Sequence, residues 1–386
     1  MTTTRCTSCG GTLAAAVEPR LPLVTPGGEG VWRYASQLPA VGEGSRVSIG
    51  EGGTPLLRAP RLSAELGVDV RIKDETRNPT GSFKDRIIAV AAGVAVEAQA
   101  AGLVCASTGN AGASTAAYAA RSGLPGLVIA PVGAPFAKVT IAQVYGARWI
   151  SVEGDYSDAY SLAVAAAADL GFMNVTTTFV CPYSVAGSTT VGFELFEDLD
   201  GQVPDWIVVP IGAGPLLVGL EAAYAALRRL GLVDRVPRLL AVQPTGCAPI
   251  VRAYRDGDAN VRGWGRPDTL VSGLADPLNG YEEEGDITLA AIRRSGGAGV
   301  VVDDDSTLAW VHRLASRAGV FAEPSGAIAV AAVEQARRDG VVSQGETVVC
   351  CVTGSGLKDL KSAGTPTSPP VIRSSVEELS ELLARD

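Results

Sequence analysis

Short apolar runs alternate with longer stretches of helical periodicity through the middle of the chain. Each apolar run is of strand length and stands just before a helical stretch. This repetition predicts a parallel sheet whose strands are joined by right-handed helical crossovers. Three pairs of a strand and a helix are expected, at 103–106 with 110–122, at 127–131 with 135–145, and at 148–152 with 156–170.

A second series of apolar runs follows towards the carboxyl terminus. Strands are expected at 206–210, 239–243, 299–302 and 347–352, with a helix that follows the first of them and ends near Leu230. A chain of 386 residues is too long for one compact unit. The pattern therefore predicts an α/β fold of two doubly wound domains with mostly parallel sheets. The expected division is an amino-terminal segment at 1–30, a smaller domain at 31–185, a larger domain at 186–364, and a linker and tail at 365–386.

Both ends of the chain differ from this core. After Gly364 the sequence Thr-Pro-Thr-Ser-Pro-Pro reads as a linker, and a short amphipathic helix is expected at 375–384, packed on the surface or on a partner subunit. Near the amino terminus, Cys6 and Cys9 form half of a zinc knuckle. A closed zinc site needs four ligands and no second Cys-x-x-Cys pair is present. We therefore predict no bound metal and an unliganded tail, with a zinc site as the alternative.

Composition narrows the class of protein. The hydrophobic content of 47% permits a large core, and the apolar runs are too interrupted by Gly, Pro or charge for a transmembrane helix or a secretory signal. A net charge of −9 argues against nucleic acid or an anionic membrane as partner. The seven cysteines, an odd number, are expected to be reduced thiols. We therefore expect a cytoplasmic protein.

The single histidine excludes several kinds of catalytic site. A Ser-His-Asp triad, a Cys-His dyad or a His-rich metal site would each have to use His312. That residue lies within a helical pattern at 306–318 with no motif around it, so a surface or packing role is expected.

One lysine stands in a distinctive context. Residues 78–86 read Asn-Pro-Thr-Gly-Ser-Phe-Lys-Asp-Arg, which sets Lys84 at the start of a helix after a Pro/Gly turn. An amine in an apolar, partly closed pocket has its charged form disfavoured, so it is available as a nucleophile and later as a base. Lys84 is thus a candidate for a Schiff base with an aldehyde. The alternative is a solvated lysine in an ordinary first helical turn.

Two further loops lie between an expected strand and an expected helix, where backbone N–H groups form anion sites. Residues 106–112, Ala-Ser-Thr-Gly-Asn-Ala-Gly, suit an amino-acid carboxylate, although alone they read as a plain helix cap. Residues 210–216, Pro-Ile-Gly-Ala-Gly-Pro-Leu, can cradle a phosphate. Pro215 has no N–H to give, so one cradle bond must come from another residue or from water.

A fourth segment, 351–359, reads Cys-Val-Thr-Gly-Ser-Gly-Leu-Lys-Asp and follows the last expected strand. With the three motifs above, it resembles the fold-type II (tryptophan synthase β) pyridoxal-phosphate enzymes, and the threonine synthases in particular. Glu323-Pro324-Ser325 is a further family-like segment, so the resemblance extends over residues 50–360. It implies pyridoxal 5'-phosphate as cofactor, a small amino acid as substrate and a homodimer as the assembly.

The resemblance also implies a role for each motif. Lys84 would carry the cofactor, with Asn110 at its phenolic oxygen and the hydroxyl of Thr353 at its pyridine nitrogen. A neutral partner at that nitrogen favours elimination and replacement over transamination. The remaining implied cofactor contacts are Phe83, Gly212, Ala213, Gly214 and Leu216, and the implied contacts to the substrate carboxylate are Ser107, Thr108 and Ala111.

One segment departs from the threonine synthase pattern. Threonine synthases carry a segment like Asn-Pro-Tyr-Arg-x-Glu-Gly-Gln-Lys-Thr, whose basic residues serve the phosphate of O-phosphohomoserine. Here residues 181–190 read Cys-Pro-Tyr-Ser-Val-Ala-Gly-Ser-Thr-Thr, so Cys181, Ser184 and Thr189 replace Asn, Arg and Lys. Ala111 likewise stands where the family usually has threonine. A serine cannot imitate the bidentate fork of an arginine, so these losses favour a substrate without a phosphate.

We expect Ser184, Ser188 and Thr189 to contact this substrate. The alternative is a phosphorylated substrate bound by other residues, such as Lys138 or Arg86. The leading interpretation is a lyase or synthase that performs β- or γ-elimination or replacement on a small, non-phosphorylated amino acid, and the alternatives are threonine synthase acting on O-phosphohomoserine or a serine/threonine dehydratase. A non-catalytic binding protein would lack the lysine, and a nicotinamide-binding protein would carry Gly-x-Gly-x-x-Gly after its first strand.

Overall fold

Two sheets organise the chain in the computed structural model, which describes residues 5–6, 8–9, 11–107, 109–134, 136–364 and 368–384. The larger sheet has six strands in the order β1-β2-β10-β7-β8-β9, and the smaller has four in the order β5-β4-β3-β6. Every neighbouring pair is parallel except β1 with β2. The bounds are β1 Leu56–Arg58, β2 Asp69–Asp74, β3 Gly102–Ala106, β4 Gly126–Pro131, β5 Arg148–Val152, β6 Phe172–Asn174, β7 Trp206–Pro210, β8 Arg238–Pro244, β9 Ala298–Val302 and β10 Thr347–Val352.

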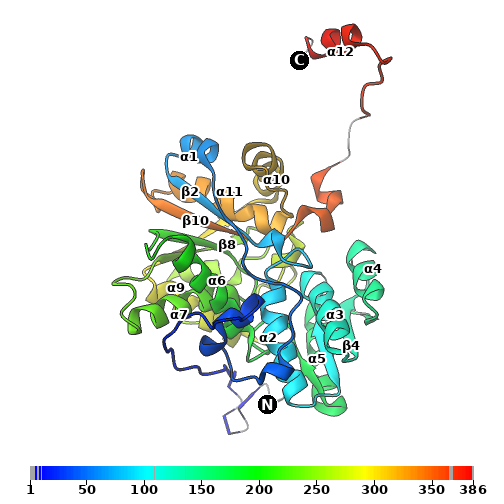
Figure 1. Cartoon of the computed structure of the whole chain (residues 1–386), viewed down its shortest axis with the longest axis vertical. Coiled ribbons are helices and arrows are strands. Elements are labelled where there is room, and N and C mark those ends of the chain that lie inside the picture. The colour runs from blue at the N-terminus through cyan, green and yellow to red at the C-terminus, as the bar shows by residue number, and fades with distance from the viewer. Residues whose placement is uncertain are drawn as a thin grey trace.

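Helices cover both faces of the larger sheet (Figure 1). One face packs against α1 (Pro60–Leu66), α10 (Asp304–Ala318) and α11 (Pro324–Arg338), and the other against α6 (Ser184–Asp198), α7 (Pro215–Arg229), α8 (Pro249–Asp256) and α9 (Glu282–Arg294). Alternate residues of β7 therefore enter different cores: Trp206 and Val208 join the first, and Ile207 and Val209 join the second. Because both faces are covered, the central strands are almost wholly apolar.

The smaller sheet is built in the same way. Leu103 and Cys105 of β3 face a core shared with α2 (Lys84–Glu97) and α3 (Asn110–Ser122), whereas Val104 and Ala106 face the core that contains α5 (Tyr156–Leu170). The helix α4 (Phe136–Val144) lies beside α3. Short 3-10 helices complete the chain: η1 Gly30–Gln37, η2 Glu43–Ser45, η3 Glu75–Arg77, η4 Ser272–Leu274, η5 Gly356–Lys358 and η6 Leu360–Ala363.

Local sequence signals explain where several helices begin and end. The side chain of Asp155 accepts hydrogen bonds from the backbone N–H of Ser157 and Asp158, at 2.7 and 3.3 Å, in a capping box that starts α5. The same helix ends at Gly171, whose left-handed conformation suits glycine. Pro215 occupies the first position of α7, where a missing N–H costs no helical hydrogen bond.

The predicted boundary between the domains is wrong in one respect. The sequence predicts one unit at 31–185, but β1 and β2 belong to the larger sheet, where β2 pairs in parallel with β10. The chain thus builds one edge of the larger sheet before it enters the smaller one. The charged residues Asp69, Arg71 and Lys73 interrupt the apolar pattern of β2, so the sequence does not predict a strand there. The strands and helices that the sequence predicts lie within about two residues of the observed elements.

The ends of the chain behave differently from the core. Figure 1 shows α12 (Val376–Leu383) standing apart from the sheets, and none of its residues is buried. The expected packing of this helix on the same chain is therefore not observed. Near the amino terminus, the sulfur of Cys6 lies 3.1 Å from the hydroxyl of Ser8. Within the described ranges, no group of three or more His, Cys, Asp or Glu side chains could hold a metal ion.

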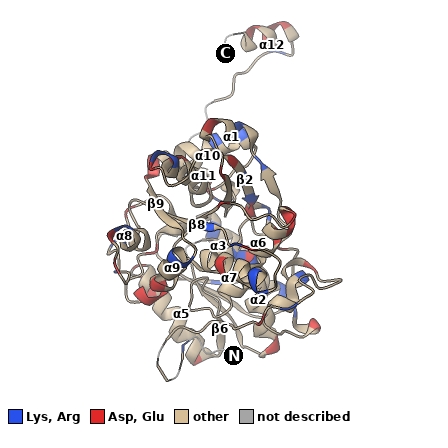
Figure 2. Cartoon of the chain, turned by 90° about the vertical axis from the view of Figure 1, so that its left-hand side faces the viewer, with Lys and Arg blue, Asp and Glu red and all other residues tan. Residues whose placement is uncertain are grey.

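Charged residues lie mainly on the outer helices, where Figure 2 shows both signs interspersed. No helix in the part of the chain that the structure describes is long and apolar enough to cross a lipid bilayer.

One group of charged residues is buried instead. Arg86, just after the start of α2, makes contacts of 2.7–2.8 Å with Glu75 and Glu194, and none of the three side chains is more than 3% exposed. Lys73 of β2 lies 2.9 Å from Glu194. We call Lys73, Glu75, Arg86 and Glu194 the buried ion cluster. It ties the first turn of α2 to β2, η3 and α6, and so fixes the position of Lys84.

Candidate active site

The turn before α2 holds Lys84 in place. The carboxylate of Asp85 accepts hydrogen bonds from the backbone N–H and the hydroxyl of Thr80, at 2.7 and 2.6 Å, and from the hydroxyl of Ser114 at 2.6 Å. The N–H of Phe83 donates to the carbonyl of Thr353 at 3.2 Å. The lysine motif and the segment after β10, distant in sequence, are thereby joined directly.

The amine of Lys84 enters a cavity of about 430 Å³, within the range usual for small-molecule sites. Burial lowers the pKa of Lys84 to about 8, although Cys105, Asp276 and Glu323 act in the opposite direction. The nitrogen lies 4.5 Å from the centre of the Phe83 ring. A larger fraction of this amine is therefore neutral near physiological pH than of an exposed lysine.

The predicted cofactor contacts all line this one cavity. The set comprises Phe83, Lys84, Asn110, Gly212, Ala213, Gly214, Leu216 and Thr353. Several of them follow the carboxyl ends of β7 and β10 or open α3, as expected for ligand sites in parallel sheets. The structure thus brings three separate motifs to Lys84.

The predicted substrate contacts divide into two groups. Ser107 and Ala111 line the cavity, and Thr108 lies outside the described residues. Ser184, Ser188 and Thr189 do not line it. The hydroxyls of Ser188 and Thr189 donate to carbonyl groups of their own helix α6, at 2.8 and 2.6 Å, and Ser184 is fully buried at its start.

A turn of small residues precedes α7. Gly214 has φ of +101°, and a Cβ placed on it would lie 2.5 Å from the side chain of Thr288, so glycine is required there. The hydroxyl of Thr288 donates to the carbonyl of Ala213 at 2.5 Å and holds the turn. The N–H groups at the start of α7 make this end of the cavity suited to an anion.

A second anion-binding end lies at the start of α3. The N–H of Gly109 donates to the hydroxyl of Ser107 at 3.0 Å. Asn110 donates through its amide to Glu323 at the start of α11, and its Oδ1 has no hydrogen-bond partner among the described residues. Lys138 of α4 is only 3% exposed and lies 3.7 Å from the other oxygen of Glu323. A Cβ placed on Gly109 would lie 2.9 Å from the Lys138 nitrogen, so this ammonium group sits directly at the loop.

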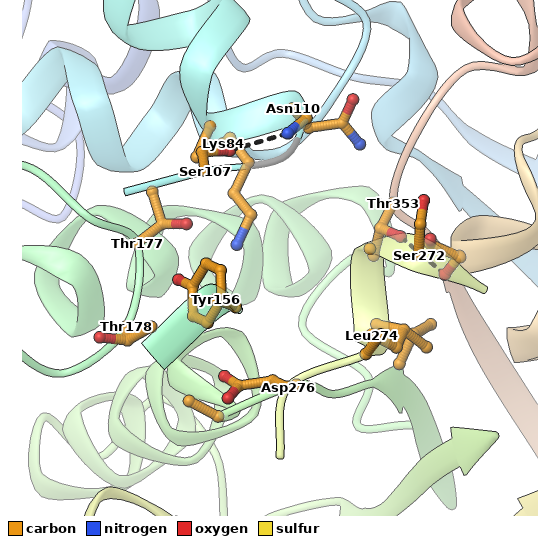
Figure 3. Close-up of a pocket in the computed structure, with 18 of the residues that line it drawn as sticks. Lys84, Ser107, Asn110, Tyr156, Thr177, Thr178, Ser272, Leu274, Asp276 and Thr353 are labelled. Atoms are coloured by element: carbon orange, nitrogen blue, oxygen red, sulfur yellow. Dashed lines mark hydrogen bonds between the residues drawn. The ribbon is translucent and has the colours of Figure 1, made fainter. Parts of the chain in front are cut away.

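Several residues that line the cavity carry no sequence motif. Tyr156 at the start of α5, Thr177 and Thr178 after β6, and the stretch 267–276 form much of the remaining wall. None stands in a motif, and only the folding of separate loops brings them to Lys84. Figure 3 shows the amine of Lys84 between Ser107 and Asn110 on one side and Asp276 on the other, with Tyr156 beside it.

These residues fit pyridoxal phosphate. A buried amine of lowered pKa suits attachment of an aldehyde. The amide of Asn110, whose Oδ1 is unpartnered, and the hydroxyl of Thr353 suit the two polar atoms of the ring. The Thr353 hydroxyl donates to the carbonyl of Ser325 at 3.0 Å and would have to turn its proton to the ring nitrogen in order to pair with it. The turn at 212–216 suits a phosphate, which would be held through amides other than that of Pro215.

Comparison with known proteins agrees with this assignment. Residues 47–354 match the family described as pyridoxal-phosphate dependent enzyme. The chain is 34% identical over 346 residues to threonine synthase of Methanocaldococcus jannaschii, covering 89% of this chain and 84% of that protein. It is 35% identical over 341 residues to threonine synthase of Mycobacterium bovis, covering 88% and 91%.

Two solved structures resemble the fold of this chain over most of their length. A threonine deaminase from T.th. has a TM-score of 0.65 and 25% identity, with 82% of this chain and 94% of that one covered. Maize serine racemase has a TM-score of 0.66 and 22% identity, with 86% and 93% covered. At the latter identity the likeness concerns the fold alone.

Proposed function

The chain belongs to the family of pyridoxal-phosphate dependent enzymes, and we propose that it catalyses elimination or replacement at the β- or γ-carbon of a small, non-phosphorylated amino acid. The observation that carries the proposal is the set of basic residues that line the cavity. No arginine is among the described residues that line it, and its lysines are Lys84 and Lys138. A phosphate dianion is best bound by the bidentate fork of an arginine.

The alternative of phosphate binding by Arg86 loses its support. The Arg86 side chain is 0% exposed and all its nitrogens contact the buried ion cluster or the hydroxyls of Thr54 and Thr190. Lys138 is in the cavity, but it faces Glu323 and the loop at Gly109. A lysine so placed suits the α-carboxylate of the substrate.

Three of the lining residues then have a chemical task. Bound pyridoxal phosphate supplies an electron sink for the charge left when the α-carbon loses its proton. The Lys84 amine would accept that proton at Nζ. Ser107 and the start of α3 orient the α-carboxylate, so that the leaving group on the side chain points away from them. Thr353, a neutral hydroxyl, does not enforce a protonated ring nitrogen.

Threonine synthase remains the second candidate, because the relatives described above carry that name at 34–35% identity. A serine/threonine dehydratase is the third. The test is to titrate the enzyme with O-phosphohomoserine and with free amino acids, following the cofactor absorbance, and to identify products by mass spectrometry.

We expect free amino acids to change the spectrum and O-phosphohomoserine at millimolar concentration to leave it unchanged. Tight binding of O-phosphohomoserine with formation of threonine would refute the proposal and favour threonine synthase. Formation of a 2-oxo acid and ammonia from serine or threonine would identify a dehydratase.

We also propose that the enzyme is a cytoplasmic homodimer. Support comes from the family resemblance and from α12, where Val376 and Leu383 are 77% and 65% exposed. Analytical ultracentrifugation should give the mass of a dimer for the full chain, and a monomer at micromolar concentration would contradict this part of the proposal.

A further inference from the structure

A carboxylate at the start of α11 contacts two side chains at the cavity. Glu323 is only 2% exposed and is part of the cavity wall. Its Oε1 accepts a hydrogen bond from the amide nitrogen of Asn110, and its Oε2 lies 3.7 Å from the nitrogen of Lys138. Asn110 and Lys138 stand on α3 and α4, which pack beside the smaller sheet, whereas α11 packs on the larger sheet. Glu323 thus links helices of both sheets at the site.

The backbone holds Glu323 in this position. Its N–H donates to the carbonyl of Gly354 at 3.0 Å, and its carbonyl accepts hydrogen bonds from the N–H groups of Gly326 and Ala327 at 2.8 and 3.0 Å. A Cβ placed on Gly354 would overlap Oε1 of Glu323 and would lie 3.0 Å from the amide nitrogen of Asn110. Glycine at 354 therefore leaves the space in which this carboxylate and this amide meet.

The surroundings of Glu323 stabilise its negative charge. The ammonium group of Lys138 is nearby, and the carboxylate stands at the amino-terminal end of α11, where the helix dipole is positive. The interaction is mutual. Burial lowers the pKa of Lys84 and of Lys358, each to about 8, and Glu323 acts against this lowering in both. The carboxylate is thus a buried anion among positively charged groups.

The charge of Glu323 decides which way the amide of Asn110 points. An ionised carboxylate only accepts hydrogen bonds, so it pairs with the NH2 group of Asn110 and not with Oδ1. One N–H of that group is used by Glu323, and the second is available for another acceptor. Oδ1 is buried and has no hydrogen-bond partner among the described residues. The phenolic oxygen of bound pyridoxal phosphate, which carries negative charge, is matched by the second N–H.

We propose that Glu323 is a positioning residue of the active site: it turns the amide of Asn110 so that an N–H, and not Oδ1, faces the phenolic oxygen of the cofactor. Asn110 contacts the cofactor, and Glu323 acts through it. A neutral side chain at 323 that both donates and accepts hydrogen bonds would let the amide turn over and present its oxygen to the negative oxygen of the cofactor. This inference rests on the proposed function in one respect, the place of Asn110 beside the cofactor, and holds whichever amino acid is the substrate.

The test is a double-mutant cycle on cofactor binding. Glu323→Gln has nearly the shape of the wild type but can donate to Oδ1 of Asn110, and Asn110→Ala removes the amide. The dissociation constant of pyridoxal phosphate is measured by titrating each cofactor-free protein and following the absorbance. Glu323→Gln should weaken binding about tenfold, as expected for a hydrogen bond to a charged group. In the Asn110→Ala background the same change should weaken it by less than about threefold, because no amide is left to be turned.

The absorbance of the bound cofactor gives a second readout, in which orientation and charge act in opposite directions. An N–H at the phenolic oxygen favours the deprotonated form of the cofactor, so its loss raises the pH at which the absorbance changes. Removing the charge of Glu323 lowers that pH, since a nearby negative charge favours the protonated form. The shift caused by Glu323→Gln should therefore be higher by about half a pH unit or more with Asn110 present than in the Asn110→Ala background.

The matched control is Glu334→Gln on the same helix. Its carboxylate contacts Trp310 and Arg313 and does not line the cavity, so the change should alter stability but neither the affinity for the cofactor nor the pH of the absorbance change. Thermal unfolding of each cofactor-free variant shows whether it is folded. Glu323→Asp keeps the charge but draws the carboxylate back from Asn110, and it takes the place of Glu323→Gln in the binding cycle should that variant not fold.

The outcomes separate this inference from the proposed function. Equal weakening of cofactor binding by Glu323→Gln in both backgrounds would show a structural role alone and refute the positioning role, while the proposed function stands. Unchanged affinity in the single variant would refute it in the same way. If Asn110→Ala alone binds pyridoxal phosphate with the affinity and absorbance of the wild type, the place of Asn110 beside the cofactor is wrong, and the role of Glu323 falls with it.

Discussion

Replacing Arg86 by methionine tests whether this residue serves the fold or a phosphorylated substrate. The guanidinium of Arg86 makes four contacts of 2.7–2.8 Å with Glu75 and Glu194, and all three side chains are buried. In the variant, Glu194 keeps Lys73 at 2.9 Å, but Glu75 keeps only neutral donors such as Thr54 and Asn78. Removing one partner of a buried ion pair costs about 3–5 kcal/mol, because the other charge stays buried without compensation. We expect a loss of this size in urea unfolding at pH 7.

The pH dependence of this loss gives a second check. Burial alone would raise the pKa of Glu194, but Arg86 and Lys73 overcome it and hold that pKa at about 2. In the wild type, this depressed pKa contributes stability above the unfolded value of 4.5, and the contribution disappears as the pH falls towards 2. Without Arg86, the pKa of Glu194 rises, and protonation relieves the buried charge. The difference between variant and wild type should therefore shrink from pH 7 to pH 5.

A matched control separates the buried ion cluster from the general loss of an arginine. Arg255→Met changes an exposed side chain on α8 and should alter the free energy of unfolding by less than about 0.5 kcal/mol. If Arg86→Met costs less than about 1 kcal/mol and instead weakens binding of O-phosphohomoserine, the structural role assigned to Arg86 is wrong.

Three further predictions concern the cavity. Lys84→Ala should abolish turnover and leave the thermal unfolding midpoint of the cofactor-free protein almost unchanged; a folded variant with wild-type turnover would contradict the assignment of Lys84. Thr353→Val should retain the cofactor but slow exchange of the substrate α-hydrogen with deuterated solvent, since a hydroxyl that lines the cavity is lost; unchanged exchange would mean that another group meets the ring nitrogen. The rate at which cofactor-free protein takes up pyridoxal phosphate should rise with pH and level off above about 8, the pKa to which burial lowers Lys84, because the neutral amine attacks the aldehyde. A rate that still rises towards the ordinary lysine value of 10.5 would show that the amine is not buried in solution.

The sequence predicted those parts of the site that lie directly after a strand or at the start of a helix. Asn110 opens α3 after β3, Gly212 follows β7, and Thr353 follows β10. The carboxyl ends of parallel strands meet at one edge of a sheet, so a correct strand assignment already places these residues near each other. Lys84 was located in the same way, as the first residue of a helix.

Residues whose position depends on how separate segments pack were not predictable in this way. Asp276 and Tyr156 lie on segments far apart in sequence, and no local pattern marks either as part of a site. The edge strand β1 and its neighbour β2 are not predicted from the sequence for a related reason. The charged residues of β2 are accommodated in the sheet because β2 pairs with β10 and because Lys73 forms an ion pair with Glu194 of α6.

The segment 181–190 shows how one sequence feature can have two physical causes. Its small residues favour a substrate without a phosphate, but the structure gives them a packing role as well. A Cβ placed on Gly219 of α7 would overlap the Cβ of Ser188, so α6 and α7 touch at this point with no space for a longer side chain. Ser184 is fully buried in the same region. Arginine at 184 would therefore have to displace packed groups, and its absence alone is weak evidence about the substrate. The stronger argument is the cavity itself, because no arginine is among the described residues that line it.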